Sequence, residues 1–192
     1  PPQYRSNEIE ERVYQLWEES GFFNPDKLPK THKKPFTIIM PPPNANGSLH
    51  VGHAVFVTLQ DIMIRFNRTR GRKTLWVPGA DHAGFETQVV FDKKLEKEGR
   101  SRFKIPRDEL YAEMLAFTQA NKKIMENQLR KLGASCDWSR EKFTLDPDIV
   151  EQVQKTFVDL YKDGLIYRGE RIINWCRKHQ TALADLETKH IE

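Results

Sequence analysis

His50 and His53 stand three residues apart at the start of a predicted helix, with Gly52 between them. Side chains at this spacing face the same side of a helix. The N-terminus of a helix carries N–H groups and partial positive charge that suit a phosphate, and two imidazoles add further donors. Gly52 leaves room for a flat ring to pack against the backbone. The pattern indicates an anion site, although structural or metal-binding histidines explain these four residues alone about as well.

A second candidate group lies in the loop 78–84. Asp81 offers a carboxylate there, which suits an ammonium group as its partner, and His82 follows it directly. The alternatives are an aspartate that forms a turn beside Gly79 and a loop histidine that is simply solvated.

Cys176 and His179 have the C-x-x-H spacing that suits two ligands of one tetrahedral zinc ion. The chain offers no second pair of this kind to complete the site. We therefore favour a cysteine that packs beside Trp175 and a solvated histidine. One zinc per chain, lost in Cys176→Ser, would reverse that preference.

Five positive charges lie within nine residues around the end of the predicted helix that begins near His50. They are Arg65, Arg68, Arg70, Arg72 and Lys73. Each could contact a nucleic-acid phosphate. A basic, solvated helix end favoured by the helix macrodipole is the more common reason for such a cluster.

The elements that must position these residues alternate between strand and helix. Such an order predicts a βαβ unit with a parallel sheet, which binds ligands beyond the carboxyl ends of its strands. The turn 41–47 and the loop 78–84 follow the two strands, so we expect them to face one crevice. The predicted elements are a strand over 36–40, a helix from 48 or 50 to 70, a strand over 74–77 and a helix over 87–97.

Further helices are predicted on both sides of this unit. Periodic apolar residues indicate helices over 7–20, 106–131 and 148–162, the first capped by Ser6 or Asn7. Two short strands are expected over 165–167 and 171–173. Within the predicted helix that ends near residue 70, one apolar stripe contains Val55, Leu59, Ile62, Met63 and Phe66.

Length and composition limit the classes of protein that fit. The 192 residues allow one domain, or one and a fragment, and no apolar run is long enough for a membrane span. Two cysteines exclude a disulfide scaffold and fit a reducing compartment. The charge excess of +4 permits a nucleic-acid partner without indicating one.

Four segments, in this order, resemble the signatures of class I aminoacyl-tRNA synthetases. The segment 41–54 resembles their nucleotide-binding signature, whereas the loop 78–84 with Thr87 and Gln88 is similar to the valyl subgroup. The segment 132–140 is also similar to that subgroup, and the residues 174–176 and 181–185 complete the match. The resemblance runs from about residue 9 to residue 187.

The resemblance implies an α/β fold with a Rossmann-like parallel sheet and flanking helices. Residues 1–35 would form an N-terminal helix and polar loop, and 36–192 the first half of the nucleotide-binding catalytic domain, ending where the family inserts an editing domain. The implied activity is ATP-dependent activation of valine to valyl-adenylate and its transfer to tRNA, with Mg²⁺ accompanying ATP. A cytoplasmic monomer without a membrane partner is expected for the longer enzyme.

The resemblance also assigns roles to individual residues. His50 and His53 would be catalytic by stabilising charge on the ATP phosphates. The implied ATP-binding set is Asn46, Gly47, His50, Gly52 and His53; the amino-acid-binding set is Pro42, Asn44 and Asp81; and the adenylate-binding set is His82 and Gly84. The chain departs from the family at Ala45-Asn46, where Val-Thr is common, and at Phe85-Glu86, where smaller residues are usual.

Other classes of protein remain open at this point. They are another synthetase of the isoleucyl, leucyl and valyl group, a synthetase-derived binding module without catalysis, and a small nucleotidyltransferase with the same histidine pattern. The loop 78–84 and the segment 132–140 argue against the last. Valine-dependent exchange of pyrophosphate into ATP would separate these classes.

Overall fold

The computed structural model describes residues 3–189 and 191. The chain divides into two compact units, one reaching to Val150 and the other starting at Glu151. Each unit is described by itself below. Among the described residues, none of the helices combines the length and apolar character that crossing a membrane requires.

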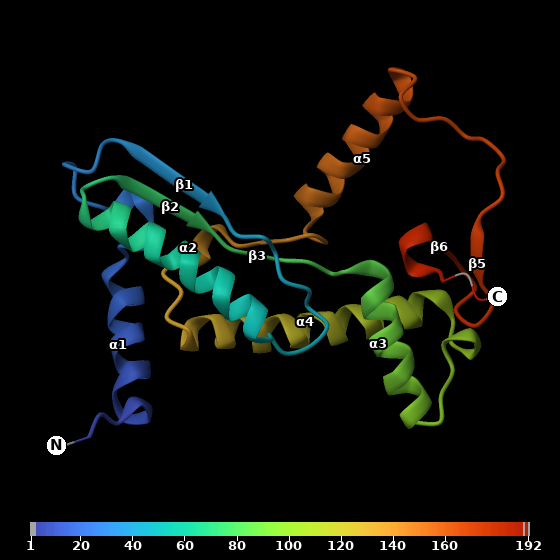
Figure 1. Ribbon diagram of the computed structural model, residues 1–192, viewed down its shortest axis with the longest axis horizontal. Helices are drawn as coiled ribbons and strands as arrows, with labels where there is room; N and C mark the ends of the chain where they lie inside the picture. The colour runs from blue at the N-terminus through green and yellow to red at the C-terminus, as the bar shows by residue number, and fades with distance from the viewer. Residues whose placement is uncertain (1–2, 190, 192) are drawn as a thin grey trace. The chain divides into compact units, whose positions relative to one another are not determined.

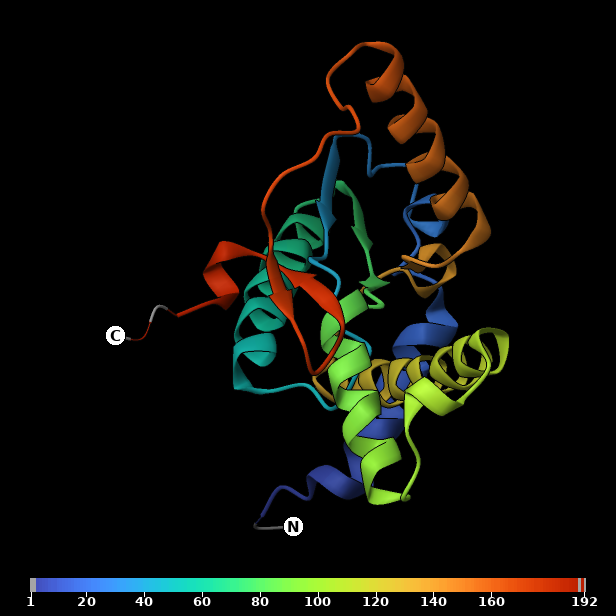
Figure 2. The same cartoon turned by 90° about the vertical axis from the view of Figure 1, so that its right-hand side faces the viewer.

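A parallel βαβ unit forms the centre of the first unit. β1 (Pro35–Ile39) and β2 (Lys73–Val77) pair in parallel, in register along their whole length, and α2 (Val51–Thr69) connects them. Figures 1 and 2 both show α2 lying along the two strands. The prediction of strand, helix and parallel strand is therefore confirmed.

The core under this unit is apolar and well filled. Trp76 on β2 is fully buried, and its indole Nε1 donates to Gln60 Oε1 of α2 at 2.9 Å. Burial of a large aromatic ring is strongly stabilising, and the indole N–H needs a partner when it is buried. The other buried members of this core are Met40, Val57, Ile64, Leu129, Ala134 and Cys136.

A second parallel pair, which was not predicted, forms a separate two-stranded sheet. β3 (Gly79–Ala80) pairs with β4 (Lys142–Phe143). A Cβ atom on Gly79 would lie 3.1 Å from the carbonyl oxygen of Lys142 and 3.4 Å from Pro42 Cβ. Glycine thus permits the close approach of β4 and the proline turn on either side of β3.

Further helices belong to the first unit. The helices are α1 (Ser6–Ser20), α3 (Gly84–Lys97) and α4 (Arg107–Lys131), with short 3₁₀ turns at Pro25–Lys27, Arg102–Lys104 and Trp138–Arg140. The predicted cap of α1 is wrong: Arg5 is the N-cap residue, and no side chain caps the helix. Gly21 ends α1 with φ of 74°, the left-handed conformation that favours glycine.

Tyr14 joins α1 to a segment far along the chain. Its hydroxyl donates to the carbonyl of Ala134 at 2.8 Å and accepts from Trp138 Nε1 at 2.8 Å. Burial raises the pKa of the Tyr14 hydroxyl, so it stays protonated and able to donate. The segment 132–140, which the sequence resemblance singled out, therefore holds the first helix in place.

We expect Tyr14→Phe to lower the free energy of unfolding by about 1–3 kcal/mol, because it leaves a buried carbonyl and an indole N–H without their partner. Urea denaturation measures the change. Tyr4→Phe is the matched control, since the Tyr4 hydroxyl donates to Glu10 at the surface, and its cost should be much smaller than that of Tyr14→Phe. Equal losses in both variants would contradict the role of the buried contact.

The apolar stripe predicted on α2 faces away from the core. Its five residues are 45–58% exposed, whereas Val57 and Ile64, outside the stripe, are buried against the strands. The helix is correctly predicted, but the sequence pattern alone does not indicate which of its apolar faces is covered.

The second unit contains most of α5 (Pro147–Lys162) and an antiparallel pair, β5 (Asn174–Cys176) and β6 (Thr181–Leu183), followed by a 3₁₀ turn at Asp185–Glu187. The strands predicted over 165–167 and 171–173 are wrong, since those residues lie outside helix and strand. Leu165, Tyr167 and Ile172 are largely exposed. A short apolar run forms a strand only where a partner strand can pair with it.

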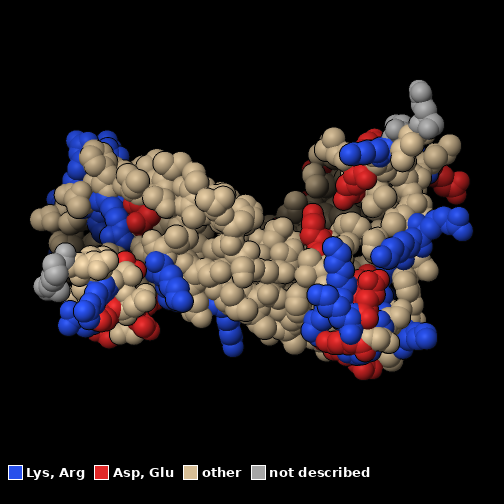
Figure 3. All heavy atoms as spheres, turned by 60° about the horizontal axis from the view of Figure 1, so that its bottom comes forward, with Lys and Arg blue, Asp and Glu red and all other residues tan. Residues whose placement is uncertain are grey.

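Three residues of the basic cluster around the end of α2, Arg65, Arg68 and Lys73, make polar contacts with other parts of the first unit. Arg65 Nη2 donates to the carbonyl of Gly133 at 2.7 Å, and Arg68 donates to Ser135 Oγ and to its carbonyl at 3.1 Å. Lys73 pairs with Asp26 at 2.8 Å. These contacts favour a structural role for the cluster. On the face drawn in Figure 3, basic and acidic side chains are interspersed.

Candidate active site

The turn after β1 and the loop after β2 meet, as the parallel pairing predicts. The N–H of Ala45 donates to the carbonyl of Asp81 at 2.7 Å, and the N–H of Asp81 donates to the carbonyl of Pro43 at 2.8 Å. Asn44 and Asp81 form an isolated parallel bridge. The two predicted groups of site residues therefore belong to one region of the first unit.

The two histidines hold each other in place at the start of α2. His50 is the N-cap residue, and its Nδ1 accepts from the N–H of Gly52 at 3.1 Å. Nδ1 of His53 accepts from the N–H of His50 at 3.2 Å, and the ring centroids lie 3.9 Å apart. Because both Nδ1 atoms accept, each neutral imidazole carries its proton on Nε2. Two Nε2–H donors thus stand side by side at a helix N-terminus.

The structure gives Gly52 a role that the sequence did not indicate. A Cβ atom at this position would lie 2.8 Å from Cε1 and 3.0 Å from Nδ1 of His50. Glycine therefore makes room for the His50 imidazole, which caps the helix. The N–H of Gly52 donates to that ring and is therefore not free to bind an anion. The donors that an anion would meet are instead the Nε2–H groups of the two imidazoles.

Burial lowers the pKa of His53, and the neighbouring His50 lowers it further. We expect its midpoint in an NMR titration to lie below the ordinary histidine value of about 6.5. Protonation of Nδ1 would remove the acceptor for the His50 N–H. The stability that this group contributes is present above the ordinary pKa and is lost as pH falls through the lowered value. A midpoint at or above the ordinary value would contradict this.

A cavity of about 410 Å³ opens beside the histidine pair. It brings together five residues that the sequence assigned to ATP or the amino acid: Pro42, Asn44, Asn46, His50 and His53. Ser48 and Phe56, which sequence reasoning missed, also line it. Its lining carries no carboxylate, so it offers neutral and imidazole donors to an anion. The other predicted site residues, Gly47, Gly52, Asp81, His82 and Gly84, lie outside the lining.

Ala45 and Asn46, which form one of the two departures from the family pattern, occupy different environments. Ala45 is fully buried beside Ala80, Met125 and Phe143, so a small side chain fits there. Asn46 lines the cavity and brings an amide that can donate in place of a hydroxyl.

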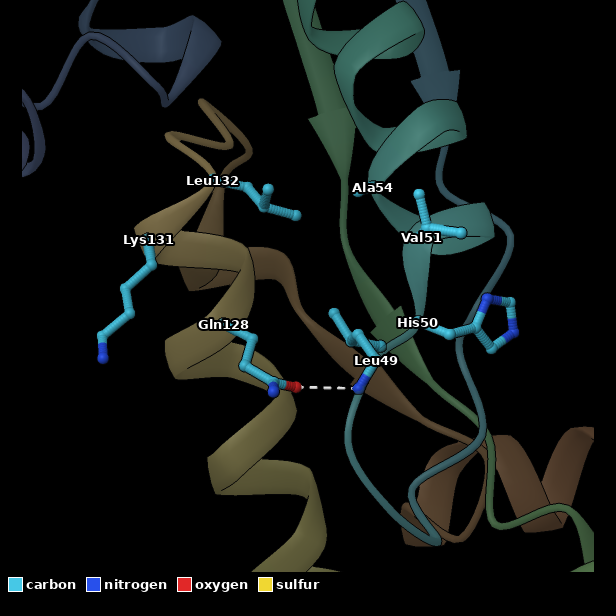
Figure 4. Close-up of a pocket in the computed structure, with 7 residues that line it drawn as sticks. All are labelled: Leu49, His50, Val51, Ala54, Gln128, Lys131 and Leu132. Carbon is cyan, nitrogen blue, oxygen red and sulfur yellow. Dashed lines mark hydrogen bonds between the residues drawn. The ribbon is translucent and has the colours of Figure 1, made fainter.

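Gln128 of α4 positions the backbone just before the histidine pair. Its Oε1 accepts from the N–H of Leu49 at 2.8 Å, beside a smaller cavity of about 330 Å³ (Figure 4). Figure 4 also shows the His50 imidazole pointing away from α4. The sequence carried no signal for this contact, because the two residues are 79 positions apart.

Asp81 shapes its loop through one oxygen of its carboxylate. Its Oδ1 accepts from the N–H of Ala83 at 3.0 Å and from the Thr144 hydroxyl at 3.3 Å. Ala83 has φ of 57° and Gly84 of 42°, so the loop turns sharply there. The turn-forming alternative for Asp81 is thus correct, and it leaves the carboxylate's second oxygen for other partners.

Cys176, the last residue of β5, and His179, in the turn that follows, also lie together. Sγ of Cys176 is 3.3 Å from Nδ1 of His179 and accepts from the N–H of the same residue at 3.4 Å. Within the part of the chain that the structure describes, no three histidine, cysteine or acidic side chains gather as metal ligands. Two ligands are too few for the four of a structural zinc site, so the described residues do not fit one by themselves.

Comparison with known proteins defines the class. The family model of the class I tRNA synthetases (I, L, M and V) matches residues 12–192, so the chain belongs to this family. A solved structure of the same class, a ternary complex of the LeuRS of Agrobacterium radiobacter K84 with tRNA and LeuAMS, superimposes with a TM-score of 0.76. It shares 29% identity and covers 95% of this chain and 21% of its own. The predicted α/β class I fold is confirmed.

Among curated proteins, the chain is similar to valine–tRNA ligases. It is 50% identical to that of Dehalococcoides mccartyi strain 195 over 97% of its length, and 49% identical to the chloroplastic/mitochondrial 2 enzyme of Arabidopsis thaliana over 95%. The enzyme of Aquifex aeolicus is 45% identical over 99%. The chain spans about a fifth of the length of these relatives: 21%, 19% and 16%. The resemblance to the valyl subgroup is therefore confirmed.

Proposed function

We propose that this chain supplies the nucleotide- and amino-acid-binding half-site of a longer valine–tRNA ligase. The enzyme would activate valine with ATP and transfer it to tRNA. The observation that carries this proposal is the histidine pair, whose two Nε2–H donors stand beside a cavity lined by uncharged residues. The 45–50% identity to valine–tRNA ligases supports valine over leucine or isoleucine.

In the activation step, the carboxylate of valine attacks the α-phosphorus of ATP and pyrophosphate leaves. His50 and His53 would donate from Nε2 to phosphate oxygens as negative charge develops on them. Asn46 and Gly47 would contribute to the same ATP site, and Gly52 would act through the position of His50. Mg²⁺ would accompany ATP as part of the substrate.

The amino acid would lie where the two loops meet. Pro42 and Asn44 would line its pocket, and the Asp81 carboxylate would bind its ammonium group. His82 and Gly84 would contact the adenylate. Residues 1–35 would form an N-terminal helix and loop, and 36–192 the first part of the catalytic domain, followed by an editing insertion.

The remaining expectations rest on the family resemblance. We propose a monomer that binds tRNA largely through regions outside this chain. A cytoplasmic location accords with the free thiols of Cys136 and Cys176, since cytosolic proteins keep their cysteines reduced.

Exchange of labelled pyrophosphate into ATP tests this function. The protein is extended to the full length of its relatives and assayed with valine, isoleucine and leucine separately. We expect exchange that depends on valine. Exchange with one of the other two amino acids would assign another member of the group, and a folded protein with no exchange would indicate a binding module.

A further inference from the structure

Thr144, to which the sequence assigned no role, lies against Asp81 and His82 of the loop 78–84. The parallel pairing of β3 with β4 brings it there, and the N–H of Thr144 continues the ladder by donating to the carbonyl of Ala80 at 3.1 Å. Asp81 and His82 directly follow β3, just as Thr144 directly follows β4. Two segments more than sixty residues apart thus end side by side.

The Thr144 hydroxyl makes three polar contacts. It accepts from the N–H of His82 at 2.9 Å and donates to Asp81 Oδ1 at 3.3 Å. Its third contact is with His82 Nδ1, at 2.6 Å. A hydroxyl has a single proton and two lone pairs. Since an ionised carboxylate can only accept, a Thr144 hydroxyl that donates to Asp81 takes its contact with Nδ1 from an imidazole N–H.

The surroundings of the imidazole support the same assignment. Nδ1 of His82 also lies 3.5 Å from Asp81 Oδ1, an oxygen that can only accept when the carboxylate is ionised. Both oxygens near Nδ1 therefore favour a proton on it. A neutral His82 then has its lone pair on Nε2, the opposite arrangement to that of His50 and His53.

The same contacts orient the carboxylate. Both hydrogen bonds to Asp81 reach Oδ1, one from Thr144 and one from the N–H of Ala83. The side chains of Asp81 and His82 are 37% and 40% exposed, so a ligand can reach them. Among the described residues, Oδ2 is the oxygen left for a cationic ligand group.

We propose that Thr144 is a positioning residue for the amino-acid site. It holds Asp81 so that Oδ2 meets the ammonium group of the substrate, and it fixes His82 with the proton on Nδ1 so that Nε2 accepts from a hydroxyl or ammonium donor. This proposal rests on the proposed function for its ligand, but the arrangement of protons concerns the chain alone.

The proton arrangement is tested first, by long-range ¹H–¹⁵N NMR of the 192-residue chain at a pH where its imidazoles are neutral. We expect His82 to be protonated on Nδ1, and His50 and His53 on Nε2. Thr144→Ser should keep the His82 signature, and Thr144→Val should reduce its Nδ1–H population. A wild-type His82 protonated on Nε2 overturns the proposal, as does a signature unchanged in Thr144→Val.

The kinetic test uses pyrophosphate exchange in the protein extended to the full length of its relatives. Thr144→Val should raise KM for valine about tenfold, while KM for ATP changes less than about twofold, because the lost hydrogen bond orients a charged partner of the amino acid. Thr144→Ser should restore KM for valine. Parallel rises in both KM values would indicate a merely structural role and overturn the proposal.

Thr118→Val is the matched control. Thr118 is buried, and its hydroxyl donates to the Met114 carbonyl of its own helix, away from the loop. We expect its KM for valine to equal that of the wild type; a rise matching that of Thr144→Val would overturn the specific role of Thr144. If the wild-type extended protein shows no valine-dependent exchange, the proposed function fails, and the NMR signature still decides whether Thr144 sets the protons of His82.

Discussion

Replacing His53 with asparagine should lower kcat for adenylate formation about 10²–10³-fold, the usual cost of losing one donor to a developing charge. Asparagine places an oxygen near the position of Nδ1, so it can still accept from the N–H of His50. It has nothing at the position of Nε2. The variant therefore keeps the contact that begins α2 and loses the donor. Pyrophosphate exchange in the full-length enzyme measures the rate, and KM for valine should change little.

Glutamine at the same position provides the opposite control. Its amide N–H can reach the position of Nε2, whereas its flexible chain no longer supplies the acceptor at Nδ1. We expect His53→Gln to retain kcat within about tenfold of the wild type while lowering thermal stability more than His53→Asn does. If asparagine and glutamine lose rate equally, His53 acts through the helix start alone, and its catalytic role is contradicted.

Gly52→Ala should lower kcat/KM about 10²-fold, because the added methyl group would occupy the space of the His50 imidazole and displace it. Displacement also breaks the hydrogen bond from the Gly52 N–H to Nδ1. Alanine is a better helix former than glycine, so the variant should remain folded. Circular dichroism and pyrophosphate exchange together separate lost activity from lost structure.

A double variant identifies the cause of that loss. When His50 is already replaced by alanine, the ring is absent and the methyl group at position 52 has nothing to displace. The variant with both changes should therefore be no less active than His50→Ala alone, so the two effects are strongly non-additive. Fully additive losses would mean that Gly52 is needed for another reason, such as the close approach of a nucleotide to the backbone.

Much of this fold could be predicted, because its long helices and its parallel pair leave strong local patterns. The spacing of apolar residues located α2 and α4, and the proline turn marked the end of β1. Short strands carry little pattern of their own. For this reason β3 and β4 were not predicted. Strands were expected over 165–167 and 171–173, whereas the strands in that part of the chain are β5 and β6.

The candidate site, too, could be predicted only in part. The order of strand and helix around His50, His53 and Asp81 was sufficient to predict that the turn and the loop that carry them meet. The contacts of Gln128 and Thr144 with this site could not be predicted from the sequence, because each hydrogen bond joins residues more than sixty positions apart. The reason for Gly52 was also hidden, since it depends on the direction in which one imidazole turns.

The contacts of Tyr14 limit the order in which parts of this protein can pack during its synthesis. Its partners, Ala134 and Trp138, lie 120 and 124 residues further along the chain. At a ribosomal rate of 5–20 residues per second, Trp138 is made roughly 6–25 seconds after Tyr14. During that interval α1 has neither of these partners to dock against. α1 therefore cannot make these two contacts until the segment 132–140 has been synthesised.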